Sequence, residues 1–254
     1  MAAVGLLHPG EMGAALGRAL RERGHDVLWA SAGRSDGTAR RADDAGLVDA
    51  GTVEDLAARS EVILSVCPPH AATEVAASVA SASALFVDAN AIAPATARGI
   101  AAERDAARFV DGGIIGPPPR EPGTTRLYLS GRQAKVAAAL FEGTPVDARV
   151  VSDEIGDASA VKMTYAAWTK GTAALLLAIR AVAEGEGVEP ALLEEWRLSL
   201  PELPETVDRA ARSAAAKGWR WVGEMEEIAA TFAAAGQPDG FHKAAAEIYR
   251  RAET

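Results

Sequence analysis

The opening of this chain constrains its fold more than any other part of the sequence. An apolar segment, Ala3–Leu7, is predicted to be a strand, and it runs into a turn that contains Gly10 and Gly13. An Ala- and Leu-rich helix is predicted over Met12–Arg23. Amides at a helix N-terminus lack intrahelical partners and carry the positive end of the helix dipole, so this order favours a phosphate site. The dinucleotide fingerprint is incomplete, because His8 takes the place of its first glycine, and an ordinary strand-to-helix turn is the alternative.

The residues after the second predicted strand, His25–Ala30, indicate which dinucleotide the chain binds. NAD-specific domains place an Asp or Glu at this strand end, where it accepts from the ribose hydroxyls. Here no carboxylate stands at the strand end, and Ser31, Arg34 and Ser35 follow instead. Hydroxyl donors and a guanidinium suit a 2′-phosphate, so we predict NADP rather than NAD. A solvated polar loop with an ordinary surface arginine is the alternative.

Strands and helices continue to alternate up to about residue 151. Alternation of this kind predicts an α/β fold with a doubly wound parallel sheet, whose ligand lies at the carboxyl ends of the strands. The loops Cys67–His70, Asn90–Pro94 and Gly112–Pro119 are expected at that end of the sheet. Helices are predicted at 53–59, 71–81 and up to Ala102. Further strands are predicted at Val62–Val66, Leu85–Asp88 and Arg108–Asp111, with edge strands at Thr125–Ser130 and Ala148–Val151.

After Gly156 the pattern becomes helical throughout. A long buried helix is predicted from Asp157 to about Glu186, because the segment is rich in Ala, Leu and Val and contains only two glycines. The sequence therefore predicts two domains, an α/β cofactor domain over 1–151 and an all-helical substrate and dimerisation domain over 152–254. Four more helices are expected at Pro190–Leu200, Pro204–Lys217, Trp219–Ala235 and Pro238–Ala252.

Composition argues against several classes of function. The net charge is −9 and no basic run is present, so nucleic-acid binding is not expected. Apolar stretches are interrupted before they reach a membrane-spanning length, so no membrane association is expected. The single cysteine, Cys67, has no internal disulfide partner, which fits the cytoplasm. His70 and His242 lack Cys or His partners at ligand spacing, so no metal site is predicted.

Three segments of the sequence resemble one superfamily in the right order. Val4–Gly13 resembles the opening of the 3-hydroxyacid dehydrogenase and 6-phosphogluconate dehydrogenase superfamily, Asp111–Pro117 resembles its substrate loop, and Gly156–Lys162 resembles the helix that carries its catalytic lysine. Lys217–Ile228 is similar to an uncharacterised branch with a phosphogluconate-dehydrogenase-like C-terminal domain. The resemblance implies a Rossmann-type N-terminal domain followed by an all-helical C-terminal domain, and an NAD(P)-dependent oxidoreductase.

The chain departs from the pattern of that superfamily at the substrate side. In the predicted substrate loop, Ile115, Gly116 and Pro117, an isoleucine replaces the family's serine and a proline replaces its last glycine. Four residues after Lys162, Ala166 replaces an asparagine. These changes remove polar groups that would hold a hydroxy acid, so the family's substrates do not carry over to this chain.

Lys162 is the predicted catalytic residue. Burial of an ammonium ion is costly and favours its neutral form, which suits a general acid/base that delivers a proton to a carbonyl oxygen. A lysine whose charged end reaches solvent at a domain boundary is the alternative. Tyr165, one turn further on, shares a helix face with Lys162, and its hydroxyl is a candidate replacement for the missing asparagine; an ordinary buried tyrosine is the alternative.

The function predicted from these features is an NADPH-dependent oxidoreductase that acts on a small carbonyl or hydroxy compound. An imine reductase-like enzyme and a catalytically inactive NADP-binding sensor are the alternatives. A homodimer is expected, because the helical domain is small and Ala-rich and carries a bulky cluster at Trp219, Trp221 and Met225. The predicted cofactor-binding residues are Leu7, His8, Pro9, Gly10, Glu11, Met12, Ser31, Gly33, Arg34, Ser35, Val66, Cys67, Pro68 and Asn90.

Overall fold

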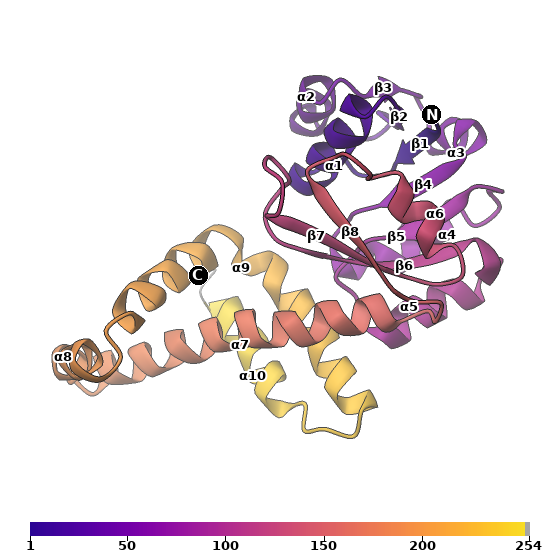
Figure 1. The fold of residues 1–254 in the computed structure, drawn as a ribbon. Coiled ribbons are helices and arrows are strands. Elements are labelled where there is room, and N and C mark those ends of the chain that lie inside the picture. Colours follow the sequence, from indigo (N-terminus) through magenta and orange to yellow (C-terminus); the bar gives the residue numbers. More distant parts are fainter. Residues whose placement is uncertain (252–254) are drawn as a thin grey trace. The chain divides into compact units, whose positions relative to one another are not determined.

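The computed structural model describes residues 1–251 and divides into two compact units, Met1–Lys162 and Met163–Thr254 (Figure 1). The boundary between the units falls inside a helix, after Lys162, whereas the sequence predicted a boundary after residue 151. The last three residues of the predicted helical domain, including the predicted helix end at Ala252, lie outside the described residues.

The first unit is built on one sheet with the strand order β3-β2-β1-β4-β5-β6-β7-β8. All neighbouring strands are parallel except β6 and β7, which are antiparallel. This mostly parallel, doubly wound sheet followed by helices confirms the predicted fold class. The strands are β1 Ala3–Leu6, β2 Asp26–Trp29, β3 Val48–Asp49, β4 Val62–Ser65, β5 Leu85–Asp88, β6 Phe109–Ile115, β7 Thr125–Ser130 and β8 Val146–Ser152.

Helices cover the sheet, and two apolar clusters form the core of this unit. Successive side chains of a strand point to opposite faces, so Leu64 belongs to one cluster and Ile63 to the other. Near-continuous apolar strands such as β4 and β5 are explained by burial on both faces. The helices are α1 Glu11–Glu22, α2 Asp36–Asp44, α3 Val53–Arg59, α4 Ala72–Ala77, α5 Pro94–Ala102 and α6 Ala134–Ala139, with single 3₁₀ turns at Pro69–Ala71 and Ala106–Arg108.

Strands β6 and β7 each differ from a sequence prediction. Strand β6 continues through Ile115, although the sequence placed a loop from Gly112 onward. Gly112 and Gly113 pair with Leu129 and Tyr128 of β7. Neighbouring atoms approach both positions too closely for a Cβ atom, and a Cβ on Gly112 would lie 2.8 Å from the Asp88 carbonyl oxygen. The strand β7 lies between β6 and β8 and is therefore not an edge strand as predicted.

The second unit consists of helices. Helix α7, Asp157–Gly185, begins in the first unit, and α8 Glu189–Ser199, α9 Leu203–Ala234 and α10 Gly240–Arg251 follow. The two helices predicted on either side of Gly218 are one continuous helix, since a single interior glycine weakens a helix without ending it. Of the predicted bulky cluster, Met225 is fully buried and Trp219 is half exposed.

Helix α7 differs from the expectation of a buried helix. By length and composition it is apolar enough to cross a membrane, contrary to the sequence-based expectation of no such stretch, and a third of its most apolar window is buried (33%). A core helix of a globular domain passes the same test, so the finding is weak evidence for a membrane. The exposed apolar side chains on this helix are Tyr165, Trp168, Leu175, Ile179 and Val182.

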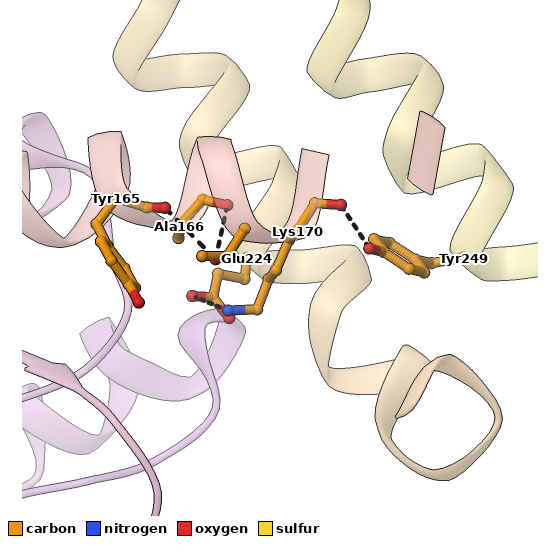
Figure 2. A network of polar contacts seen from close by, with 6 residues as sticks. Tyr165, Ala166, Lys170, Glu224 and Tyr249 are labelled. Carbon is orange, nitrogen blue, oxygen red and sulfur yellow. Dashed lines mark hydrogen bonds and ion pairs between the residues drawn. The ribbon is translucent and has the colours of Figure 1, made fainter. Parts of the chain in front are cut away.

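A polar network inside the second unit joins three of its helices (Figure 2). Lys170 of α7 donates to Glu224 Oε1 of α9 at 2.9 Å, and only 16% and 9% of the two side chains are exposed. The Tyr249 hydroxyl of α10 donates to the Lys170 carbonyl oxygen at 2.6 Å. The Tyr249 ring packs edge-on against Trp221, with ring centroids 5.1 Å apart. A buried charge pair of this kind depends on both partners.

We expect Lys170→Met to lower the free energy of unfolding by about 3–5 kcal/mol, because it removes a cation that pairs with the buried Glu224 carboxylate. Urea unfolding followed by circular dichroism measures the loss. Lys243→Met is the matched control, since Lys243 pairs with Asp239 on the surface and 66% of its side chain is exposed; this variant should change stability little. Equal losses in the free energy of unfolding for the two substitutions would show that the buried pair stabilises the fold no more than a surface pair does.

Candidate functional site

The turn between β1 and α1 has the geometry that a phosphate site requires. A Cβ atom on Gly13 would lie 2.1 Å from the His8 carbonyl oxygen, so only glycine lets the helix pack this closely on the strand end. A Cβ on Gly10 would meet nothing within 4 Å, which leaves room for a ligand beside the backbone. Gly10 is the last residue before α1, and Glu11 and Met12 form the first turn of that helix.

His8 stands where the fingerprint has its first glycine. Its ring is largely buried, and its Nδ1 atom is buried without a hydrogen-bond partner in the described part of the chain. Burial, with the nearby positive charge of Arg34, lowers the pKa of His8 to about 4. The ring is therefore neutral at physiological pH and adds no charge to the turn.

Two arginines contact the same turn from the chain that follows β2. Arg34 Nη2 donates to the Leu7 carbonyl oxygen at 3.3 Å, and its Nε is buried without a partner among the described residues. Arg41, on α2, donates from Nε to the Pro9 carbonyl oxygen at 3.2 Å. Both guanidinium groups therefore lie beside the candidate phosphate turn. Sequence reasoning missed Arg41, since α2 was not predicted and only its packing brings the residue back to the turn.

The other residues predicted to bind a 2′-phosphate have partners of their own. The Ser35 hydroxyl accepts from the Thr38 amide at 3.3 Å and so caps α2. Ser31 hydrogen-bonds the carboxylate of Asp49 and thereby lowers the pKa of Asp49. Gly33 adopts a positive φ of 72° in the turn between them. No carboxylate follows β2 itself, but the parallel pairing of β2 and β3 aligns Asp49, on the neighbouring strand, with Trp29.

The ends of β4 and β5 are joined by a buried amide. Asn90 Oδ1 accepts from the Cys67 amide at 2.5 Å, and Asn90 Nδ2 donates to Ser65 Oγ at 3.1 Å. Asn90 is buried and holds the two strand ends together, so its predicted contact with a nicotinamide ribose stays a prediction. Burial raises the pKa of the Cys67 thiol to about 12, which makes it a poor nucleophile. Val66 and Pro68 flank this thiol and are half-buried.

Two buried carboxyl groups stand side by side on β5 and β6, where Asp88 pairs in register with Asp111. Asp88 Oδ1 accepts from the Asn90 amide at 3.0 Å, and Oδ2 has no partner within residues 1–251. Burial, together with the negative charge of Asp111, raises the pKa of Asp88 to about 7, against the opposing effects of the Asn90 hydrogen bonds and of Arg104. Burial also raises the pKa of Asp111, and hydrogen bonds from Ser159, Ser130 and Gly156 oppose that rise.

The predicted substrate-loop residues lie at the end of β6. Ile115 is the last residue of the strand and is buried, so it does not belong to a loop. Gly116 has φ +122°, and a Cβ on it would lie 2.2 Å from the Thr124 carbonyl oxygen. The Pro117 carbonyl oxygen accepts from the Thr125 hydroxyl at 2.5 Å, which closes the turn. This strand end therefore offers an apolar side chain and backbone where the superfamily pattern has a serine.

Lys162 is the last residue of the first unit, and it stands over the sheet. A Cβ atom on Gly113 would lie 2.7 Å from Lys162 Cβ, so the second turn of α7 rests directly on β6. The Lys162 side chain is half-buried. Tyr165 belongs to the second unit; it is 47% exposed, and its hydroxyl has no hydrogen-bond partner in the described structure. No group of three His, Cys, Asp or Glu side chains that could hold a metal is found among residues 1–251.

Comparison with known proteins gives the family. Residues 3–92 match the family model "NADP oxidoreductase coenzyme F420-dependent", and residues 183–252 match a "domain of unknown function (DUF1932)". The chain is 30% identical over 193 residues to the "uncharacterized 28.5 kDa protein in 7S RNA 5'region" of Methanothermus fervidus, covering 75% of this chain and 74% of that protein. The chain therefore belongs to the family of that protein, within the superfamily of 3-hydroxyacid dehydrogenase-like oxidoreductases that the sequence motifs predicted.

Solved structures agree with this assignment. A conserved protein of unknown function, described as structurally similar to 3-hydroxyacid dehydrogenases, is 28% identical, with a TM-score of 0.73 over 99% of this chain and 96% of its own. A conserved hypothetical protein from Sinorhizobium meliloti 1021 is 25% identical, with a TM-score of 0.72 over 98% and 88% of the two chains. The 3-hydroxyisobutyrate dehydrogenase of Mycobacterium tuberculosis shares the fold at 18% identity, with a TM-score of 0.74 over 99% and 93% of the two chains.

Asp88 gives a prediction for the pH dependence of stability. The folded chain holds a proton on Asp88 up to a pKa of about 7, whereas an ordinary Asp releases it near 3.8. Stability from this group is therefore fully present at low pH and is lost as the pH rises through the folded pKa. Asp88→Asn keeps the acceptor for the Asn90 amide and removes the titration. The free energy of unfolding of the variant minus that of wild type should rise by about 1.4 kcal/mol per pH unit and level off above about pH 7, because only the wild type loses stability over this range.

Urea unfolding at several pH values between about 5 and 8 measures this difference. The charged groups that act on Asp88 are Asp111 on β6 and Arg104 after α5, and both remain in the variant. Asp153→Asn, at an exposed position, is the control and should give a difference that does not change with pH. A constant difference for Asp88→Asn as well would contradict the assignment of a buried proton.

Proposed function

We propose that this protein is an NADP-dependent oxidoreductase that interconverts a small carbonyl compound and the corresponding alcohol. The observation that supports it best is the turn after β1. It combines open space at Gly10 with buried nitrogen atoms on His8 and Arg34 that have no partner in the described part of the chain, and Arg41 stands beside it. Buried polar atoms without a partner are rare in folded proteins, and here they fit a ligand with phosphate groups.

The residues that would hold NADP follow from this geometry. The turn and the first residues of α1 would bind the pyrophosphate, and Arg34 and Arg41 would supply positive charge for the additional phosphate. Ser31 would lie beside the adenosine ribose. The Ser65, Cys67 and Asn90 group would form the wall beside the nicotinamide. When bound, the cofactor supplies or accepts the hydride of the reaction.

Lys162 has the acid/base role in this proposal. Its ammonium group gives a proton to the carbonyl oxygen as negative charge develops there, and the neutral amine then recovers a proton from water. In the opposite direction the amine takes the proton of the hydroxyl group. The buried Ile115 contributes only apolar contact, so the substrate is held by fewer polar groups than the superfamily pattern provides.

We expect Arg34→Ala to weaken NADPH binding by roughly 1–3 kcal/mol, because charge-assisted hydrogen bonds are lost, and to affect NADH less. Fluorescence titration of both cofactors against both proteins measures this. Arg40→Ala is the matched control, since Arg40 lies on the same helix as Arg41 and is exposed. Equal losses for the two cofactors, or tighter binding of NADH by the wild type, would exclude NADP specificity.

Lys162→Met should lower turnover by a factor on the order of 10²–10⁴, the usual range for the loss of a general acid, and leave NADPH affinity nearly unchanged. Lys162→Arg should also fail, because a guanidinium does not release its proton near neutral pH. Tyr165→Phe should lower turnover by a smaller factor than Lys162→Met does. NADPH oxidation across a panel of aldehydes, keto acids and imines supplies the assay. Full activity of the methionine variant on a verified substrate would assign Lys162 a structural role.

We further propose that the protein is a cytoplasmic homodimer that pairs through α7. Five exposed apolar side chains form one stripe along this helix: Tyr165, Trp168, Leu175, Ile179 and Val182. Their spacing is three, seven, four and three residues, and each of these steps returns to the same helix face. An exposed apolar stripe of this length favours association with a second copy.

Light scattering at micromolar concentration should give the mass of a dimer, and Ile179→Glu should give the mass of a monomer. Leu198→Glu is the control, because Leu198 is 77% exposed on α8 and lies outside the stripe. A monomeric wild type refutes the proposal.

A further inference from the structure

The start of α7 is capped by the sheet and not by its own sequence. A helix normally receives a side-chain cap from the residue before its first turn, but here that residue is Gly156, which has no side chain. Asp111 Oδ2, on β6, accepts from the Gly156 amide at 3.0 Å and from the Ser159 amide at 2.9 Å. Ser130 Oγ, on β7, accepts from the Ala158 amide at 3.0 Å.

The two capping side chains and the side chain of Ser159, in the first turn of α7, also bond to one another. The Ser159 hydroxyl donates to Asp111 Oδ1 at 2.5 Å, and the Ser130 hydroxyl donates to Asp111 Oδ2 at 3.1 Å. All three side chains are fully buried. The carboxylate thus receives four hydrogen bonds and stands at the positive end of the helix dipole, an arrangement that favours its charged form and fixes the helix start.

The same contacts set the place of Lys162. Asp111 and Gly113 lie two residues apart on one face of β6, a span of about 6.6 Å. On α7, Ser159 and Lys162 lie about one turn apart, a rise of about 4.5 Å along the helix axis. Ser159 bonds Asp111, and Lys162 Cβ rests against Gly113. The helix therefore runs along the strand with its first turn bonded to Asp111. All of these residues belong to the first unit.

We propose that Asp111 is a positioning residue for Lys162, which holds the start of α7 on the sheet through its carboxylate and the hydroxyls of Ser130 and Ser159. The inference rests on the acid/base role proposed for Lys162. Asp111 does not reach substrate, because it is buried beneath the helix start. A displacement of about 1 Å in a catalytic group can lower a rate about a hundredfold, so a loosened cap is expected to show in turnover.

Asp111→Asn tests the inference, because it keeps the shape of the side chain and removes the charge and one acceptor atom. We expect turnover to fall about tenfold or more, with NADPH affinity within about twofold of wild type. In a Lys162→Met background the same substitution should have no further effect on turnover. Asp157→Asn is the matched control, since it removes an equal charge from the first turn of α7 without touching β6, and it should stay close to wild type.

A second measurement needs neither substrate nor cofactor. The chain has five lysines, so ¹³C-methylation of their amines gives few NMR signals, and Lys162→Met assigns the one of interest. Asp111→Asn should shift the Lys162 signal and leave that of Lys243 unchanged. If Asp111→Asn does not fold, Ser159→Ala removes one hydroxyl of the cap and should shift the same signal by less.

The outcomes separate the two proposals. If Lys162→Met is inactive while Asp111→Asn keeps wild-type turnover and an unshifted Lys162 signal, the positioning inference is wrong and the function of Lys162 stands. If Lys162→Met is fully active, the acid/base role is wrong and the positioning inference falls with it. Additive losses in the double variant would show that Asp111 acts through overall stability and would also overturn the inference.

Discussion

The buried carboxylate of Asp111 is the interaction on which the rest of this structure depends. A parallel sheet and a long helix must meet where the chain leaves the α/β unit, and the helix brings unpaired amides to that junction. Burying those amides without partners costs about 1–3 kcal/mol each, so the sheet has to supply acceptors. Asp111 and Ser130 supply them from two neighbouring strands. Because the acceptors sit on β6 and β7, the helix can begin only in one place and one direction over the sheet.

The turn after β1 shows how the protein accommodates a residue other than glycine at the first position of the fingerprint. His8 replaces a glycine, yet its ring is neutral because burial and Arg34 depress its pKa. The positive charge at the turn comes instead from Arg34 and Arg41, which bond carbonyl oxygens of Leu7 and Pro9. A helix N-terminus already attracts an anion, and two guanidinium groups beside it strengthen that attraction while bracing the turn. The turn thus carries positive charge although its sequence departs from the fingerprint.

Elements that depend on neighbouring residues could be predicted from the sequence. Contacts between segments far apart in the chain could not. Leu85–Asp88 and Val53–Arg59 were predicted with the bounds that the structure shows, because short apolar runs and capping residues act over a few positions. The α2 helix was not predicted, since its nine residues are mostly charged or small and carry no apolar period. Asp49 beside Ser31, and Glu224 beside Lys170, are brought together by strand pairing and helix packing, which spacing in the sequence does not reveal.

The two neighbouring carboxyl groups show how packing assigns a proton. Asp88 and Asp111 are equally buried and stand in register, so electrostatic repulsion opposes ionisation of both. Four donors, two of them amides at the start of α7, surround Asp111 and favour its charged form there. Asp88 receives one amide bond, and its second oxygen has no partner among the described residues, so less opposes the effect of burial, which raises the pKa of Asp88 to about 7. The helix start and the protonation of the sheet are therefore linked, because anything that loosens α7 from Asp111 also reduces the difference between the two carboxyl groups.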